Sequence, residues 1–386
     1  MYMYKKALAL QPWLTEVYRA LHQIPELGRE LPETIAFVTS KLDEIGVRHR
    51  PCAGGILAEL PAGESRPTVA LRADMDALPV EEETGLPWSS RHSGKMHACG
   101  HDVHTTCALG ALRLLSMEEK RAATLRVLFQ PDEEGDGGAA MMIEDGALDG
   151  VSAALGLHIA PTRPAGSIAA ISGRARAASN AFSITLKGRG CHGAYPHLGI
   201  DTIAGAAAII STLQTLVSRE TDPLDSVALT IGHFEAGHAR NVIPETAQID
   251  GILRTLTPQT RKRCCTRLRE IVTGMAGALR LQADIFIANG YPPVMNHPAE
   301  AEFVRQVAAD EFGAENVIVP EFPEMGVDDF AYLAERVPGC YAELGCRGPD
   351  QPSLPLHNPH LAPHESCLPV GAAMTAAWAL RHREKG

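Results

Sequence analysis

Side chains that can bind metal ions or move protons stand directly after short apolar runs in the first half of the chain. These runs, at 68–72, 125–129 and 153–157, have the length and composition of buried strands. Because ligands of a parallel sheet bind beyond the carboxyl ends of its strands, side chains at these positions can meet in one site. The side chains concerned are Asp74, Asp76, Glu133, Glu134 and His158.

A further group of this kind, MHACGHDVH at 96–104, directly precedes an apolar segment at 104–117. Cys99 and His101 are two residues apart, so they would point in different directions on a helix, but they converge in an extended segment before a helix begins. A thiolate, imidazoles and a carboxylate form a site for zinc, manganese, nickel or cobalt rather than for calcium or magnesium. The alternative is that Cys99 is a small buried apolar residue and His101 an ordinary helix-start residue. The Glu pair and His158 at neighbouring strand ends favour the metal site.

The adjacent Glu133 and Glu134 are the second feature that indicates chemistry. Two neighbouring buried carboxylates repel each other, so they are not both ordinary core residues. If one of them binds a metal ion, the other can take a proton from a water molecule and pass it to a leaving group. The alternative is a solvated acidic loop. The glycine-rich continuation GDGGAAMM disfavours that alternative, because it lets the backbone turn closely past a site before a helix.

The elements that must position these residues alternate between strand and helix. Apolar spacing predicts helices at 7–21, 34–45 and 104–117, and short apolar runs between them predict strands. Short strands separated by helices indicate a mostly parallel sheet with helices on both faces. The fold class expected for the larger part of the chain is therefore α/β.

The pattern changes near residue 178. Strand-like and helix-like segments then follow in the order β-α-β-β-α-β over about 110 residues, which is the ferredoxin-like α+β arrangement. From Tyr291 onward the alternation of helix and strand resumes. We therefore expect a metal-binding catalytic domain made of residues 1–177 and 291–386, with a smaller domain inserted at 178–290.

Composition excludes several classes of protein. The chain has 386 residues and a formal net charge of −11, with no long Lys/Arg run, which disfavours a nucleic-acid partner. No uninterrupted apolar stretch is long enough for a membrane span, and the apolar run at the N-terminus is too short for a signal peptide. Nine cysteines without disulfide-framework spacing indicate a reducing compartment, so we expect the cytoplasm.

One motif is typical of a different class of protein. The segment 188–193 (GRGCHG) fits G-x-G-x-x-G and follows a strand-like run, as in nucleotide-dependent oxidoreductases. Such a fold next requires a helix and an acidic residue about 20 positions later. Tyr195-Pro196-His197 interrupts that helix and Asp201 comes too early, so a nucleotide site is not expected.

Taken together, the motifs resemble the M20 metallopeptidase family. The resemblance is closest to its amidohydrolase branch, which includes hippurate, indole-acetyl-amino-acid and N-acetyl-diaminopimelate hydrolases. The motifs run in family order over nearly the whole chain. They are LRADMDALP (71–79), MHACGHDVH (96–104), QPDEEGDGGAAMM (130–142), LGLHIAP (155–161), GCHGAYPHLGIDT (190–202), NVIPE (241–245), MGVDDFAYL (325–333) and LHNP (356–359).

The resemblance implies a site with two divalent metal ions (Mn²⁺, Zn²⁺, Ni²⁺ or Co²⁺). Glu133 would be the general base toward a metal-bridging water and later the acid, and Asp74 would support the metal centre. In the inserted domain, which would act as a lid and dimerisation domain, His192 matches a residue that stabilises the oxyanion, often from a partner subunit. Asn241 matches a residue of substrate binding. The implied metal ligands are Cys99, His101, Glu134, His158 and His357.

The expected activity is hydrolysis of the amide bond of N-acyl amino acids, with an acetyl or aromatic acyl group, in a homodimer or larger homo-oligomer. The alternatives are a metallo-carboxypeptidase or dipeptidase acting on short peptides, and a non-enzymatic metal- or metabolite-binding protein of the same fold. The intact Glu133 counts against the last of these.

Two positions depart from the family pattern. Asp132 stands where an alanine is usual, which would place a third carboxylate near the metals and so affect metal preference or the pKa of Glu133. The segment after His357, NPHLAPHES, is His-rich where an aromatic–acidic run is usual, so the edge of the substrate pocket there is expected to differ.

Overall fold

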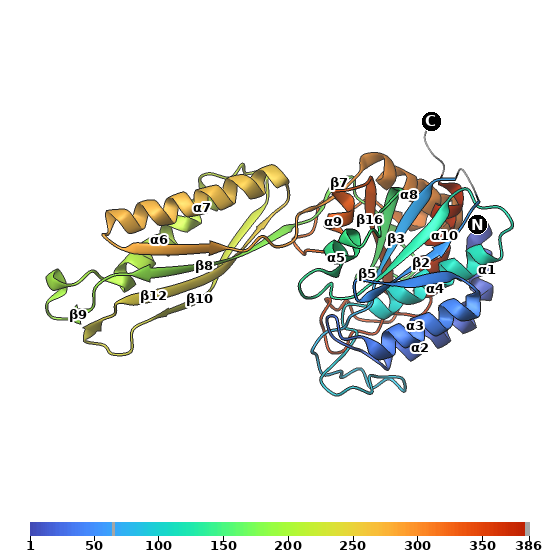
Figure 1. Cartoon of the computed structure of the whole chain (residues 1–386), viewed down its shortest axis with the longest axis horizontal. Coiled ribbons are helices and arrows are strands. Elements are labelled where there is room, and N and C mark those ends of the chain that lie inside the picture. The colour runs from blue at the N-terminus through green and yellow to red at the C-terminus, as the bar shows by residue number, and fades with distance from the viewer. Residues whose placement is uncertain (64–65, 383–386) are drawn as a thin grey trace. The chain divides into compact units, whose positions relative to one another are not determined.

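The computed structural model describes residues 1–63 and 66–382, which form two compact units (Figure 1). The first unit comprises residues 1–173, 295–322 and 329–386, and the second comprises residues 174–294 and 323–328. Among the described residues, no helix has both the length and the apolar character needed to cross a bilayer. All nine cysteines lie in the described ranges, and they are free thiols.

An eight-stranded sheet forms the centre of the first unit, in the order β1-β2-β4-β3-β5-β16-β6-β15. The four central strands β4, β3, β5 and β16 run parallel, while β2 pairs antiparallel with β4 and β6 pairs antiparallel with β16. The prediction of a mostly parallel α/β sheet is therefore confirmed. The strands are β1 (Arg48–Cys52), β2 (Gly55–Leu60), β3 (Thr68–Asp74), β4 (Thr124–Gln130), β5 (Val151–Pro164), β6 (Ile168–Ala169), β15 (Val317–Ile318) and β16 (Gly339–Arg347).

Helices cover both faces of this sheet, as the alternation of side chains along β5 demonstrates. Ile159 meets Gly100 at the start of α4, whereas Gly156 meets the ring of Phe330 at the start of α9. Positions 156 and 159 have opposite parity on a regular strand, so α4 and α9 lie on opposite faces. The helices of this unit are α1 (Tyr2–Ala9), α2 (Gln11–His22), α3 (Pro32–Ile45), α4 (His101–Ser116), α5 (Gly138–Glu144), α8 (Pro298–Phe312), α9 (Ala331–Ala334) and α10 (Cys367–Arg381).

The N-terminal helix differs from the sequence prediction. The segment expected as one helix at 7–21 belongs to two helices, α1 and α2, which join at Leu10. Pro12 stands in the first turn of α2, where its missing N–H needs no partner. Apolar spacing alone did not reveal this break, because both helices place their apolar residues on the same core.

The second unit is an antiparallel sheet in the order β10-β12-β8-β13, with two helices packed on one face. A buried core between helices and sheet includes Ile184, Ile249 and Leu268. The strands β9 and β11 of the same unit form a separate, short antiparallel pair. The elements are β8 (Ala178–Lys187), β9 (Cys191–His192), α6 (Thr202–Ser218), β10 (Val227–Ala236), β11 (Val242–Ile243), β12 (Thr246–Thr255), α7 (Pro258–Ala278) and β13 (Gln282–Ile287); β7 (Gly173–Arg176) pairs with β14 (Val294–Asn296).

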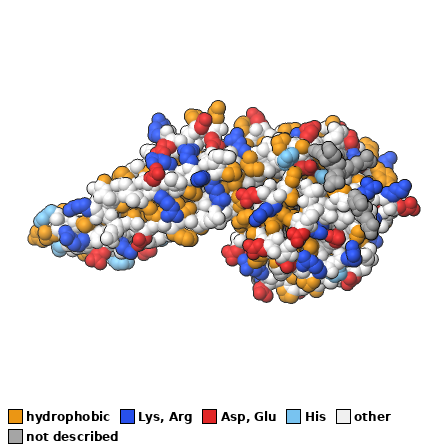
Figure 2. Space-filling view, turned by 45° about the horizontal axis from the view of Figure 1, so that its top comes forward, with side chains coloured by type: hydrophobic (Ala, Val, Ile, Leu, Met, Phe, Trp, Pro, Cys, Tyr) orange, Lys and Arg blue, Asp and Glu red, His pale blue; other side chains and the backbone are white. Residues whose placement is uncertain are grey.

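Acidic and basic side chains are interspersed over the face of the molecule drawn in Figure 2. Lys and Arg do not form a continuous stripe on that face. A basic stripe is the electrostatic feature expected of a surface that binds a phosphate backbone.

The packing of β5 against α9 generates a stability prediction. A Cβ added at Gly156 would lie 2.9 Å from the Phe330 ring, which is closer than carbon atoms approach without displacement. We expect Gly156→Ala to lower the free energy of unfolding by about 1–3 kcal/mol through overpacking. The measurement is chemical denaturation of the purified protein.

Gly274 is the matched control for this substitution. It lies in α7, and a Cβ there would have no atom within 4 Å. Gly274→Ala is expected to leave the free energy of unfolding unchanged or to raise it by up to about 1 kcal/mol, because alanine favours helix. Equal free energies of unfolding for the two variants would contradict the packing argument.

Candidate metal centre

The chain brings Cys99 and His101 together by a sharp turn at the start of α4. Gly100 has a φ of +81°, and a Cβ at this position would lie 2.2 Å from the Cδ1 atom of Ile159. Glycine therefore satisfies both the left-handed backbone and the close approach to β5. The turn allows the thiol and the imidazole, two residues apart, to face the same site, as the sequence pattern required.

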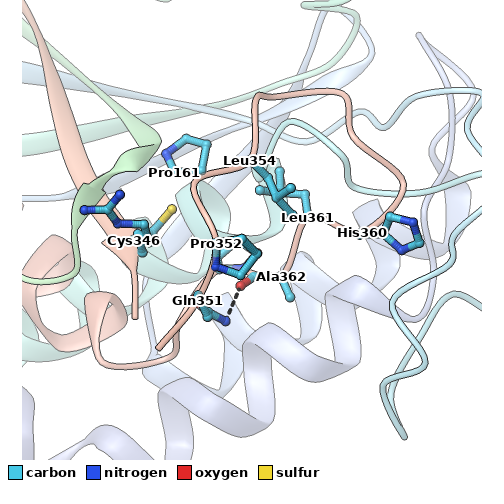
Figure 3. Close-up of a pocket in the computed structure, with 10 residues that line it drawn as sticks. Pro161, Cys346, Gln351, Pro352, Leu354, His360, Leu361 and Ala362 are labelled. Carbon is cyan, nitrogen blue, oxygen red and sulfur yellow. Dashed lines mark hydrogen bonds between the residues drawn. The ribbon is translucent and has the colours of Figure 1, made fainter. Parts of the chain in front are cut away.

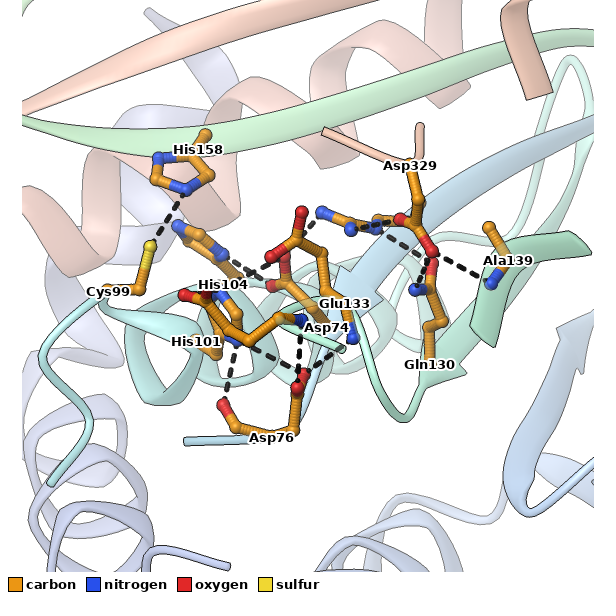
Figure 4. Close-up of polar contacts among 12 residues, drawn as sticks. Asp74, Asp76, Cys99, His101, His104, Gln130, Glu133, Ala139, His158 and Asp329 are labelled. Carbon is orange, nitrogen blue, oxygen red and sulfur yellow. Dashed lines mark hydrogen bonds and ion pairs between the residues drawn. The ribbon is translucent and has the colours of Figure 1, made fainter. Parts of the chain in front are cut away.

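The five residues implied as metal ligands lie close together in the first unit, and Figure 4 shows three of them, Cys99, His101 and His158. The Sγ atom of Cys99 is 3.5 Å from Nε2 of His158, and Oε1 of Glu134 is 3.3 Å from Nε2 of His357. Within each of two groups, Cys99–His101–His158 and Cys99–Glu134–His357, the donor atoms lie within 4.8 Å of one another. Glu133 forms a third such group with His101 and Glu134.

The protonation of two of the histidines can be deduced from their partners. Nδ1 of His101 donates to the carbonyl oxygen of Asp76 at 2.7 Å, and Nδ1 of His158 donates to the carbonyl oxygen of Ile159 at 2.8 Å. A carbonyl oxygen only accepts, so Nδ1 of each ring carries a proton, and in the neutral form of each ring Nε2 presents a lone pair. Backbone carbonyls of this kind commonly orient the histidines of metal sites.

His104 is the histidine that cannot serve as a ligand in this geometry. Its Nε2 accepts the backbone N–H of Ile159 at 2.8 Å, so its proton is on Nδ1, which donates to Asp74. Both ring nitrogens are therefore engaged by the protein. His104 thus ties the middle of β5, next to His158, to the carboxylate at the end of β3.

The donor set and its surroundings fit divalent cations. The buried Nε2 atom of His101 has no hydrogen-bond partner. Burial opposes a charge on His101, but the nearby Asp74 carboxylate and Cys99 outweigh it and raise its pKa well above the usual value, so the site favours positive charge. Burial raises the pKa of the Cys99 thiol, and a bound metal would displace that proton. Sulfur, nitrogen and oxygen donors together suit zinc, manganese, nickel or cobalt.

Asp74 is completely buried behind the candidate ligands. Burial raises its pKa, but the charges of Arg72, His101 and His104 outweigh burial and hold the pKa well below the usual value. Arg72 donates to Asp74, to Gln130 at 2.9 Å and to Asp329 at 2.7 Å. A buried arginine thus compensates two buried carboxylates from opposite ends of the sequence.

Asp76 and Asp329 are residues whose roles the sequence did not reveal. The two carboxylate oxygens of Asp76 accept the backbone N–H groups of Glu133 and Glu134, each at 3.1 Å. Asp329 accepts from Gln130 at 2.7 Å and from the N–H of Ala139, at the start of α5, at 3.0 Å. A role for Asp76 at the site could have been predicted, because Asp76 follows Asp74 at the same strand end. For Asp329, the sequence offered only its place in the motif MGVDDFAYL (325–333).

His192 and Asn241 belong to the second unit, where both are exposed. His192, in β9, pairs with Val242 of β11, and the N–H of Gly193 donates to the carbonyl oxygen of Asn241 at 2.7 Å. The short β9–β11 pairing therefore places these two predicted residues side by side.

The His-rich segment after His357 lines a small cavity beside the last residues of β5 and β16 (Figure 3). Its volume of about 130 Å³ is below the roughly 300–1,000 Å³ of ordinary ligand pockets. Gln351 spans it by donating to the carbonyl oxygen of Ala362 at 3.0 Å. This cavity alone therefore does not hold a whole N-acyl amino acid. Its lining includes Pro161, Cys346, Gln351, His360 and Leu361.

Comparisons with known proteins extend these observations. The family described as Peptidase family M20/M25/M40 matches residues 70–381. The chain is 42% identical to the N-acetyl-L-cysteine deacetylase of Bacillus subtilis (strain 168), covering 88% of this chain and 82% of that protein. It is 38% identical to the Arabidopsis thaliana IAA-amino acid hydrolase ILR1-like 5, covering 96% and 86%.

A solved structure is similar over the same length. The crystal structure of the Bacillus subtilis YXEP protein, a dinuclear metal-binding peptidase from the M20 family, covers 96% of this chain and 98% of its own. The TM-score is 0.84 at 32% sequence identity. At this similarity the fold and the metal-dependent hydrolase class are shared.

The buried ion pair between His22 and Asp102, the residue that follows His101, generates a second stability prediction. Nδ1 of His22 lies 2.6 Å from Asp102, and Nε2 lies 3.3 Å from Glu82. Burial lowers the pKa of His22, but these two carboxylates outweigh burial and raise it to about 10. His22→Phe would leave Asp102 buried without its counter-charge, so we expect a loss of about 3–5 kcal/mol in the free energy of unfolding.

Thermal and denaturant unfolding would measure this loss. His49→Phe is the control, because His49 is a partly exposed histidine of β1 that lies 3.9 Å from Asp43. A change within about 1 kcal/mol is expected there. If His22→Phe unfolds at the same denaturant concentration as the wild type, the buried ion pair has no net stabilising role.

Proposed function

The chain belongs to peptidase family M20/M25/M40, and from this premise we propose that it hydrolyses the amide bond of N-acyl amino acids. The observation that carries the proposal is the meeting of Cys99, His101, Glu134, His158 and His357 beside Glu133 in one unit. The relatives named as N-acetyl-L-cysteine deacetylase and IAA-amino acid hydrolase support an N-acyl amino acid as substrate. The same names make the short-peptide alternative less favoured.

In this proposal, the five residues implied as ligands would hold two divalent cations. Cys99 belongs to two of these donor groups. When bound, such cations would supply Lewis acidity toward the acyl carbonyl and would make a nearby water more acidic. Manganese, zinc, nickel and cobalt are all compatible with these donors.

Glu133 is proposed as the group that moves the proton. It is 7% exposed, and its backbone N–H is held by Asp76, so its position beside His101 and Glu134 is defined. Glu133 takes a proton from the attacking water as the oxygen bonds to the acyl carbon. It then gives that proton to the amine nitrogen as the carbon–nitrogen bond breaks. The products are a carboxylic acid and a free amino acid.

The second unit is proposed to be a lid and dimerisation domain. His192 would donate a hydrogen bond to the developing oxyanion, from the partner subunit of a homodimer, and Asn241 would bind substrate. The family resemblance and the exposure of both side chains support this assignment. We place the protein in the cytoplasm, because a metal-binding Cys99 and eight further free thiols are typical of a reducing compartment.

A substrate panel tests the proposed reaction. Protein reconstituted with Mn²⁺, Zn²⁺ or Co²⁺ is incubated with N-acetyl amino acids, N-benzoyl amino acids and dipeptides, and the released amino acid is quantified. We expect release from the N-acyl substrates and a loss of kcat of about 10²–10⁴-fold in Glu133→Gln, which should retain its metal. Glu144→Gln, on the α5 helix, is the matched control and should keep full activity. Turnover of dipeptides alone would replace the proposal by the peptidase alternative.

Subunit mixing tests the role of His192 in trans. Glu133→Gln and His192→Ala subunits are co-expressed with different tags, and the mixed dimer is isolated in two affinity steps. Each variant alone is expected to be inactive, whereas the mixed dimer should regain one of its two sites, which is about half of wild-type turnover per dimer.

The control pair for this mixing experiment is Glu133→Gln with His357→Ala. Both removed groups belong to the same unit of the chain, so a mixed dimer of these two variants should stay inactive. Absence of activity in the Glu133→Gln and His192→Ala dimer as well would rule out the trans arrangement.

A further inference from the structure

Asp132, the residue before the Glu pair, is closely packed and held by an ion pair in the first unit. Its backbone has a φ of +60°, in the left-handed region that only a few residue types adopt readily. Oδ2 accepts from Nε of Arg29 at 2.7 Å, and the side chain is 8% exposed. Two glycine backbones approach Oδ1: a Cβ would lie 3.3 Å away at Gly28 and 2.2 Å away at Gly135.

The backbone around Asp132 forms the turn that carries the two glutamates. The carbonyl oxygen of Asp132 accepts the N–H groups of Gly137 and Gly138, each at 3.1 Å. On its other side, the turn is held by Asp76 through the N–H groups of Glu133 and Glu134. The direction in which the glutamate side chains leave the turn therefore depends on the conformation of residue 132.

The loop that carries Arg29 is itself anchored to the metal-site segment. The N–H of Ala77 donates to the carbonyl oxygen of Glu26 at 2.7 Å, and Leu27 forms a parallel bridge with Ala77. The carboxylate of Glu26 accepts the N–H of Thr34, at the start of α3, at 2.8 Å. Arg29 thus connects a fixed loop to the turn. The loop is bonded to Ala77 and the turn is bonded to Asp76, so the segment 74–77 holds both.

We propose that Asp132, anchored by Arg29, is a positioning residue that holds Glu133 and Glu134 in the orientation needed for metal binding and proton transfer. The inference rests on the proposed function. The Asp132 carboxylate is directed to Arg29 and not to the candidate metal donors, among whose groups it does not occur. Its effect on the site is therefore geometric, through the backbone, rather than that of an additional ligand.

Substitutions at position 132 separate backbone conformation from charge. Asp132→Gly keeps the left-handed backbone accessible but removes the anchor, whereas Asp132→Asn tolerates the same backbone and keeps an oxygen acceptor for Arg29. We expect Asp132→Gly to bind Co²⁺ about 10–100-fold more weakly and to lose kcat by a similar factor, with KM within about twofold. Asp132→Asn should remain within about threefold of the wild type in both measurements.

Arg29 provides an independent test, because its side chain is 48% exposed and can be removed with little risk to folding. Arg29→Ala should reproduce the Asp132→Gly effects, and the double variant should be no worse than either single variant. Arg267→Ala is the matched control: its Nε lies 2.7 Å from Glu220 in the second unit, and the side chain is 37% exposed. This control should leave Co²⁺ affinity and kcat unchanged.

Co²⁺ affinity is measured by chelator competition and by visible absorption, including the thiolate-to-cobalt band of Cys99, alongside turnover and unfolding temperature. Wild-type Co²⁺ affinity and kcat in both Asp132→Gly and Arg29→Ala would overturn the inference, whatever their unfolding temperatures. Equal losses in Asp132→Asn and Asp132→Gly would also overturn it, in favour of a direct effect of charge. A wild-type protein that neither binds Co²⁺ nor hydrolyses N-acyl amino acids would instead overturn the proposed function, and this inference with it.

Discussion

The burial of carboxylates at the end of β3 and in the loop before α9 is the constraint on which the rest of the site depends. An unpaired charge inside a protein is strongly unfavourable, so each of these groups must have fixed partners. Asp74 has Arg72 and His104, Asp76 has two backbone N–H groups, and Asp329 shares Arg72 with Asp74. The positions of β3, β4, β5 and the loop before α9 are therefore coupled through these contacts.

This network also explains how a site of mixed donors stays available to cations. The compensating groups engage the supporting carboxylates and the Nδ1 atoms of the histidines, while Nε2 of His101 has no hydrogen-bond partner. Supporting contacts of this kind orient metal ligands and set their protonation states. The glycine before α4 adds the last requirement, because it allows Cys99 to approach β5.

Much of the fold and of the candidate site could be predicted from the sequence. The parallel sheet followed from apolar runs separated by helical spacing, and the five implied ligands do lie together. The break between α1 and α2 was missed because it changes neither the apolar face nor the helix content. Asp132 was expected to add a third carboxylate near the metals; its carboxylate is directed to Arg29 instead.

Residue types and local spacing were sufficient to determine which donors the protein carries, that strands and helices alternate, and to which family the chain is similar, because these depend on short-range patterns. Only the tertiary structure decided what each donor contacts. Arg72 and Asp329 are 257 residues apart, and Arg29 and Asp132 are 103 apart, so no local pattern relates them. Such partners are chosen by the packing of the whole sheet and its loops, since a buried charge pairs with whichever group the fold places beside it.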